Sequence, residues 1–316
     1  MDTINTTMNT TRDTTANRME DNKIRDNCRG VDFAFLDSGT GGIPYMMELK
    51  HKMPDARCVY VGDTAHFPYG EKSADEVTES AAASITEIVH RWNPDTLVIA
   101  CNTISVTSLA ELRSRFPSLP IVGTVPAIRL AARVSRNKRI GLLATNATVR
   151  HPYCEDLIRK YAADCEIFKR GDPDLISFIE HSLFTATEEE RMAAVQPAVS
   201  QFLDQGCDTI ILGCTHFTHV AGSIAAAAGK DVEVVDSRDG VAKQALKVWK
   251  GTDEVAEQGF TSQTEPPLPY RTDLPADKSF FVTLLRSPED EEEYRDLCAS
   301  FHIPWGGEIS FTSYNS

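Results

Sequence analysis

Two stretches of the sequence, TLVIACNTIS (96–105) and TIILGCTHFT (209–218), decide the fold. Each begins with an apolar run, ends that run in a small residue, and continues with a cysteine and polar side chains. Continuous apolar runs of this length are typical of strands that are buried on both faces of a parallel sheet. Because ligands bind beyond the carboxyl ends of such strands, we expect Cys101 and Cys214 at a binding site.

The chain around these stretches alternates short apolar runs with segments of helical length, and this pattern predicts an α/β fold. FAFLDSGTGG (33–42) precedes the first cysteine strand, and IGLLATNATV (140–149) precedes the second by a similar distance. The spacing predicts an internal repeat: two similar domains, each with a mainly parallel sheet flanked by helices, and an active site in the cleft between them. The expected strands are Phe33–Leu36, Cys58–Val61, Thr96–Ala100, Ile121–Val122, Ile140–Ala144, Glu166–Phe168, Thr209–Leu212 and Val232–Val235. The expected helices include Ser73–Trp92, Thr103–Phe116, Tyr153–Tyr161 and Glu188–Gln205.

The sequence divides into four parts. Residues 1–30 are polar and poor in apolar side chains, which is typical of a disordered extension. Residues 31–127 are expected to form the first α/β domain, and residues 128–239 the second, with one cysteine strand in each. Residues 240–316 are expected to form a helix, a Pro-rich loop and a strand–helix–strand tail that returns to the first domain.

The composition of the 316-residue chain excludes several classes of function. A net charge of −14 disfavours nucleic-acid binding, which requires a basic face. The sequence contains no apolar run of about 18 residues and no secretory signal. We therefore expect a cytoplasmic protein that neither spans a membrane nor binds nucleic acid.

Cys101 and Cys214 differ from the other six cysteines, because polar residues follow both at matched positions. The absence of any C-x-x-C pair indicates reduced thiols rather than disulfides or a zinc ribbon. A helix that begins directly after each strand would lower the pKa of its thiol, so we expect these two to be reactive. The cysteines that we expect to be inert, buried residues are Cys58, Cys154, Cys165, Cys207 and Cys298.

LDSGTGGI (36–43) is a glycine-rich turn that leads into a helix, with Pro44 in the first helical turn. Its spacing matches neither a dinucleotide fingerprint nor a P-loop, so the helix N-terminus suits a carboxylate better than a nucleotide. Asp37 either orients a base, accepts a substrate ammonium, or only caps the helix.

Two further loops carry candidate side chains. In GDTAHFPYGEKS (62–73), Tyr69 and Gly70 could offer a hydroxyl and an N–H to a substrate, although a plain turn would look the same. In GCTHFTHV (213–220), His216 is expected to assist proton transfer at the cysteine, and His219 to be a surface or packing residue. A Cys/His metal site is disfavoured because no fourth ligand follows at a usual spacing. None of these motifs contains Arg, so neutral donors are expected to bind carboxylates.

The ordered set of motifs resembles the glutamate racemases, which are cofactor-independent. The matching motifs between residues 31 and 311 are FLDSGTGG, GDTAHFPYG, ACNT, VGTVPA, GLLAT, GCTHF, VDS and the closing FFVTLLRSPEDEEEYRDLCASF. The resemblance implies interconversion of L- and D-glutamate without a cofactor or metal, to supply D-glutamate for peptidoglycan. It also implies two α/β domains around the site, and a homodimer.

By this resemblance, Cys101 takes the α-proton from D-glutamate and Cys214 takes it from L-glutamate. Asp37 and His216 would assist the two thiols, and Glu180 would be an acidic group near the second. The substrate contacts implied are Asp37, Ser38, Tyr69, Gly70, Asn102, Thr103, Thr145, Thr215 and His216.

Three alternatives stay open at this point. A related racemase that acts on aspartate or another small acid would share both thiols, whereas a thiol hydrolase would need only one nucleophilic cysteine. A non-catalytic regulatory binding protein would need neither. The sequence also departs from the glutamate racemases after GCTHF, where Thr218 and His219 replace the usual Pro-Leu and alter the start of the next helix.

Overall fold

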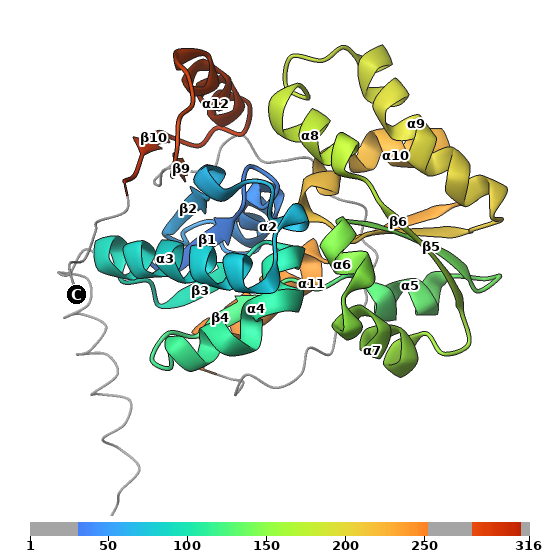
Figure 1. The fold of residues 1–316 in the computed structure, drawn as a ribbon, viewed down its shortest axis with the longest axis horizontal. Helices are drawn as coiled ribbons and strands as arrows, with labels where there is room; N and C mark the ends of the chain where they lie inside the picture. Colours follow the sequence, from blue (N-terminus) through green and yellow to red (C-terminus); the bar gives the residue numbers. More distant parts are fainter. Residues whose placement is uncertain (1–30, 252–279, 311–316) are drawn as a thin grey trace, which may run out of the picture.

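The computed structural model describes residues 31–251 and 280–310 of the chain. Within them, two separate sheets lie side by side, each flanked by helices (Figure 1). The first sheet has the strand order β10-β9-β2-β1-β3-β4 and the second has the order β6-β5-β7-β8. Every pairing in both sheets is parallel. These observations confirm the predicted fold class.

The strands lie close to their predicted positions, with small differences at their ends. The largest difference is β6, which continues to Gly171 instead of ending at Phe168. The first sheet contains β1 (Phe33–Asp37), β2 (Cys58–Gly62), β3 (Thr96–Ile99), β4 (Ile121–Gly123), β9 (Phe280–Val282) and β10 (Trp305–Glu308). The second contains β5 (Arg139–Ala144), β6 (Glu166–Gly171), β7 (Thr209–Leu212) and β8 (Glu233–Val235).

The longest helix, α3, begins with a capping box in which Ser73 and Glu76 each bond the other's backbone N–H. The helices associated with the first sheet are α2 (Ile43–Lys52), α3 (Ala74–Trp92), α4 (Asn102–Arg115), α11 (Arg238–Trp249) and α12 (Pro288–Ser300). Those around the second are α5 (Ile128–Val134), α6 (Asn146–Arg150), α7 (Pro152–Tyr161), α8 (Pro173–His181), α9 (Glu188–Asp204) and α10 (Ala221–Ala228). Three short 3-10 helices are η1 (Thr64–His66), η2 (Tyr69–Glu71) and η3 (Thr215–Val220).

The two sheets repeat one topology. In the first, β1 lies between β2 and β3, with β4 beyond β3; in the second, β5 lies between β6 and β7, with β8 beyond β7. The strands that lead to the two cysteines, β3 and β7, are therefore equivalent. Cys101 and Cys214 each follow the last strand residue at the same offset, at the carboxyl end of a central parallel strand.

Side chains on both faces of the strands are buried, as continuous apolar runs require. In β1, Phe33 and Phe35 belong to a core on one face, while Ala34 and Leu36 belong to a core on the other. The strands β5 and β7 likewise contribute to one core beneath α8 to α10 and another beneath α5 and α7. Because side chains pack on both faces of each sheet, the strand ends that carry the site are held in place.

The C-terminal segment packs on the first sheet. Helix α11 contributes Val241, Ala242, Ala245 and Val248 to the same core as α2. Strand β9 pairs with β2, β10 pairs with β9, and α12 lies against them (Figure 1). The predicted N-terminal extension and Pro-rich loop lie outside the described residues. In the described part of the chain, no helix is long and apolar enough to cross a membrane.

Candidate active site

Cys101 lies between β3 and α4 and is 5% exposed. The expected α-helix does begin directly after it, and a backbone hydrogen bond from Ile104 stabilises a thiolate. The expected lowering of its pKa is nevertheless wrong. Burial and the nearby Asp37 carboxylate raise the pKa of Cys101 well above its usual value. In this interior position, loss of water outweighs the helix N-terminus, so Cys101 is held as a thiol.

Asp37, the last residue of β1, lies behind Cys101 and is completely buried. It shares a hydrogen bond with the Cys101 thiol. It also accepts hydrogen bonds from the Ser38 N–H (2.8 Å) and the Thr215 hydroxyl (3.2 Å). Burial raises its pKa to about 6, against the lowering effect of the His216 charge. Asp37 is therefore placed to exchange protons with Cys101. It does not cap a helix, because α2 begins only at Ile43 and has no side-chain cap.

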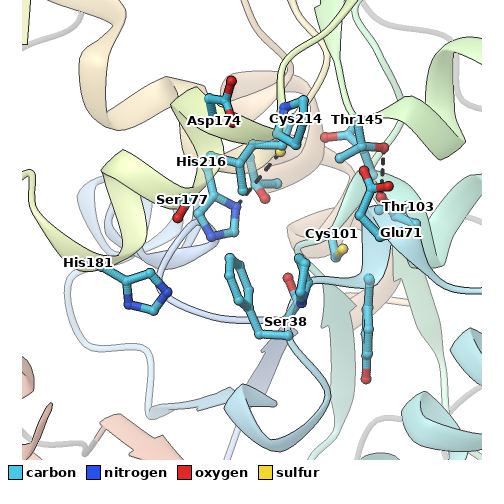
Figure 2. A pocket seen from close by; sticks show the side chains of 18 of the residues that line it. Ser38, Glu71, Cys101, Thr103, Thr145, Asp174, Ser177, His181, Cys214 and His216 are labelled. Atoms are coloured by element: carbon cyan, nitrogen blue, oxygen red, sulfur yellow. Dashed lines mark hydrogen bonds between the residues drawn. The ribbon is translucent and has the colours of Figure 1, made fainter. Parts of the chain in front are cut away.

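Cys214 ends the equivalent strand in the second sheet and is also 5% exposed. A helix begins directly after it, as expected, but this helix is the six-residue 3-10 helix η3, and the α-helix α10 begins only at Ala221. The Cys214 sulfur also lies 3.8 Å from His216 Nδ1 (Figure 2). The second thiol therefore has a side-chain imidazole beside it, which the first thiol does not have in the described part of the chain.

His216 and Glu180 form a buried pair beside Cys214. The imidazole Nε2 lies 3.0 Å from Glu180 Oε2, and both side chains are 2% exposed or less. Burial opposes protonation of His216, but hydrogen bonds to Cys214 and Glu180 outweigh it and raise the pKa well above its usual value. Burial likewise opposes ionisation of Glu180, but the bonds from His216 and Thr40 hold its pKa below its usual value. The pair is thus an imidazolium and a carboxylate, and it places a positive charge beside the Cys214 sulfur.

Both thiols line one cavity of about 390 Å³, a volume within the range of small-molecule sites. Figure 2 shows the Cys101 and Cys214 sulfur atoms turned toward this common opening, between groups from both sheets. Asp37 and Glu180 do not line the cavity and act from behind the thiols. The predicted contact residues that do line it are Ser38, Tyr69, Gly70, Asn102, Thr103, Thr145, Thr215 and His216.

Asn102 carries the clearest sign of a polar ligand. Its side chain is 1% exposed, and within the described residues neither its oxygen nor its nitrogen has a hydrogen-bond partner. A buried amide without a partner is costly, so a cavity ligand that bonds it would be favoured. On the same wall, the Thr103 and Thr145 hydroxyls lie 3.0 Å apart (Figure 2). These groups are neutral donors, as predicted for the binding of carboxylates.

Tyr69 contributes differently from the prediction. Its hydroxyl donates its hydrogen bond to the buried Asp63 carboxylate, so it does not have its proton to offer a substrate in this arrangement. Gly70, next to it, approaches Thr145 so closely that an added Cβ would lie 2.9 Å from the threonine Cβ. The loop therefore lines the cavity with the tyrosine ring and with the backbone at Gly70.

The structure adds cavity residues that the motifs did not reveal. Asp174, Ser177 and His181 come from α8, which also carries Glu180. Arg286, from the segment between β9 and α12, also lines the cavity, so a cation lies beside the neutral donors of the site motifs. Arg286 belongs to the closing motif FFVTLLRSPEDEEEYRDLCASF, and the sequence of that motif does not show that it reaches the cavity. Phe67, Pro68, Glu71, Pro173 and Ile176 complete the lining.

His219 is a packing residue, as expected. Its Nε2 lies 3.0 Å from the Thr40 carbonyl oxygen, and its ring contacts those of Phe184 and Phe301 edge-on. Burial lowers its pKa to about 4, so the ring is neutral. Thr218 bonds the Thr215 carbonyl oxygen within η3 (2.7 Å). Thr218 therefore stabilises η3 internally, and His219 joins η3 to the loop between β1 and α2. In the two described ranges, no group of three His, Cys, Asp or Glu residues could hold a metal ion.

The structure is an α/β protein with two thiols on one cavity, and comparison with known proteins identifies its class. The family model described as Asp/Glu/Hydantoin racemase matches residues 47–245. The chain belongs to this family and is an isomerase.

The individual relatives are more specific. Glutamate racemase from Treponema pallidum (strain Nichols) is 34% identical over 275 residues, which cover 87% of this chain and 95% of the relative. Glutamate racemase from Pseudomonas aeruginosa is 34% identical over 255 residues, covering 80% and 94%. Among solved structures, Escherichia coli glutamate racemase in complex with L-glutamate and the activator UDP-MurNAc-Ala matches with a TM-score of 0.73 and 27% identity over 90% of this chain and all of that one. A glutamate racemase from Bacillus anthracis matches with a TM-score of 0.69 and 25% identity over 89% and 98%.

Proposed function

We propose that the protein interconverts L- and D-glutamate by a two-base mechanism, with Cys101 and Cys214 as the two proton carriers. The observation that carries the proposal is one cavity lined by both thiols, each with its own buried acid–base partner. Two bases on one substrate allow a proton to leave one face of the α-carbon while another proton arrives on the opposite face. The relatives that are glutamate racemases support glutamate as the substrate.

In the direction from L- to D-glutamate, the Cys214 thiolate accepts the α-proton and becomes a thiol. The electron pair of the broken C–H bond stays on the substrate as a carbanion, delocalised into the α-carboxylate. The Cys101 thiol then donates its proton to the other face and becomes a thiolate. The imidazolium of His216 beside Cys214 and the raised pKa of Cys101 support this starting arrangement. The reverse direction exchanges the two roles.

Neutral donors would stabilise the charge that develops on the substrate carboxylate. The Asn102 amide, the hydroxyls of Thr103 and Thr145, and the N-terminus of α4 lie on the cavity wall. Preorganised dipoles of this kind act strongly in a site shielded from water, and they need no cofactor. We propose that the reaction proceeds without one, and that its product is the D-glutamate used for peptidoglycan.

Two further properties belong to the same proposal. The resemblance to the glutamate racemases suggests action in the cytoplasm, where peptidoglycan precursors are made, and assembly as a homodimer. Size-exclusion chromatography with light scattering would test the dimer, because a monomer at micromolar concentration would contradict it.

The test is the formation of D-glutamate from L-glutamate by the purified protein, compared with Cys101→Ser and Cys214→Ser. We expect the wild type to reach an equal mixture and each variant to lose at least roughly a thousandfold in kcat, because a serine hydroxyl is a far weaker acid than a thiol. A panel with aspartate, glutamine and alanine tests the alternative substrates. If either serine variant turned over near the wild-type rate, or if aspartate were preferred, the proposal would be wrong.

A further inference from the structure

Glu180 uses its two oxygens unequally. Oε2 accepts hydrogen bonds from the Thr40 N–H (2.9 Å) and the Thr40 hydroxyl (2.7 Å), and it also receives His216 Nε2 (3.0 Å). Within residues 31–251 and 280–310, Oε1 accepts a bond from the Tyr294 hydroxyl alone, at 3.4 Å. This contact joins the C-terminal helix α12 to the carboxylate that supports the Cys214 side of the site.

The tyrosine ring is held firmly where this contact needs it. Tyr294 is 8% exposed, its ring stacks on Trp305 at 5.8 Å with an interplanar angle of 15°, and it meets Phe280 edge-on at 5.7 Å. All three aromatic residues belong to the C-terminal segment on the first sheet, whereas Glu180 belongs to α8 beside the second. The C-terminal segment on the first sheet therefore holds the Tyr294 hydroxyl against the Glu180 carboxylate, which belongs to a helix beside the second sheet.

The surroundings of Oε1 leave little room for another arrangement. A Cβ added at Gly39 would lie 2.4 Å from Oε1, so the backbone of this loop closes one side of the carboxylate. A buried carboxylate also needs hydrogen bonds to remain ionised. The Tyr294 hydroxyl meets this need at the oxygen that His216 and Thr40 do not reach.

We propose that Tyr294 is a positioning residue for the Cys214 half-reaction: its hydroxyl holds the Glu180 carboxylate so that Oε2 faces His216. The line of contacts runs from Tyr294 to Glu180, then to His216 Nε2, and from His216 Nδ1 to the Cys214 sulfur. Cys101 has no part in this line, because its partner is Asp37. The C-terminal segment thus influences one of the two proton transfers. This inference rests on the proposed two-base racemisation.

The test is Tyr294→Phe, which keeps the ring and removes only the hydroxyl. L- and D-glutamate have equal free energy, so kcat/KM stays equal in the two directions and cannot distinguish the two thiols. The primary kinetic isotope effect with substrate deuterated at the α-carbon can distinguish them. We expect kcat to fall roughly two- to tenfold, the value of one weak hydrogen bond to a charged group. The isotope effect should rise with L-glutamate, which Cys214 deprotonates, and fall with D-glutamate.

Tyr161→Phe on α7 is the matched control, because it removes a tyrosine hydroxyl from a ring that packs against the core beneath α5 and α7 and does not line the cavity. Its kcat and isotope effects should stay at the wild-type values. Unchanged kcat and isotope effects in Tyr294→Phe, or the same opposite movement in Tyr161→Phe, would overturn the inference. Failure of the proposed function would look different, because the wild type itself would then form no D-glutamate.

Discussion

In the proposed mechanism Asp37 acts through Cys101, because it shares a hydrogen bond with this thiol and does not line the cavity. The two thiols consequently have different partners: a carboxylate beside Cys101, and an imidazolium–carboxylate pair beside Cys214. This difference matches the two states that the reaction needs at its start, a thiol on one side and a thiolate on the other. The chemistry is asymmetric even though the fold is repeated.

The pKa of Asp37, about 6, sets a pH dependence. Above this value Asp37 is ionised and accepts the Cys101 proton; below it Asp37 is protonated and does not. We expect kcat/KM to fall as the pH drops through about 6, equally in both directions. Asp37→Asn should remove this acid limb and lower kcat by roughly 10- to 1000-fold, because proton transfer loses its acceptor. If kcat/KM of Asp37→Asn still fell as the pH dropped through about 6, another group would be responsible for the pH dependence.

At the level of secondary structure, the turn between β1 and α2 packs on the acid–base groups themselves. An added Cβ at Gly39 would meet the Glu180 carboxylate, and one at Gly41 would lie 2.5 Å from His216 Nδ1. These glycines are needed for the close approach of backbone to side chain, not for a left-handed conformation. The glycine-rich motif therefore accommodates the catalytic groups of the second sheet.

Gly39→Ala tests this packing. We expect kcat to fall by at least roughly tenfold, since Glu180 must move away from its hydrogen bonds, and stability to fall by about 1–3 kcal/mol. Gly222→Ala in α10 is the matched control, because nothing lies within 4 Å of its added Cβ. It should leave kcat unchanged and stabilise the helix by about 0.5–1 kcal/mol. Thermal unfolding and steady-state rates check both, and an active Gly39→Ala protein would contradict the packing argument.

Sequence patterns predicted strands and their ends well, because buried parallel strands leave continuous apolar runs. They misjudged the thiol environments. A helix N-terminus is visible in a sequence, but the burial that raises the pKa of Cys101 depends on what packs around it. Glu180 was implied only by resemblance, since its helix has no local signal that distinguishes it. Arg286 and Tyr294 belong to the closing motif of the tail, but a motif does not reveal which distant residues it will contact after folding.

At the scale of the whole molecule, the net charge of the chain is negative, whereas the cavity lining includes a positively charged side chain. The chain carries a net charge of −14, so its overall field repels an anionic substrate such as glutamate, yet Arg286 contributes a positive charge to the cavity lining. The repeated topology explains the rest of the arrangement. Equivalent central strands from two parallel sheets bring two cysteines to one opening, and the C-terminal segment completes the lining.

Arg286→Gln tests the electrostatic contribution. We expect KM for glutamate to rise roughly three- to tenfold with kcat nearly unchanged, because a cation at the cavity attracts the substrate without entering the chemistry. The dependence of kcat/KM on ionic strength should also change. Arg295→Gln removes the same charge from an exposed pair with Glu291 on α12 and should alter neither quantity. Equal effects of the two substitutions would show that only net charge matters.

Solvent deuterium labelling tests the central claim, that two separate thiols move the proton, most directly. The wild type is incubated with L-glutamate in deuterated water, and label at the α-carbon is followed in both enantiomers by NMR or mass spectrometry before equilibrium. Two bases predict that newly formed D-glutamate carries deuterium while the remaining L-glutamate stays largely unlabelled, because Cys214 removes the proton and Cys101 supplies a solvent-derived one. Early deuterium in the L-glutamate pool, at a rate comparable to its appearance in D-glutamate, would indicate one shared base and contradict the account.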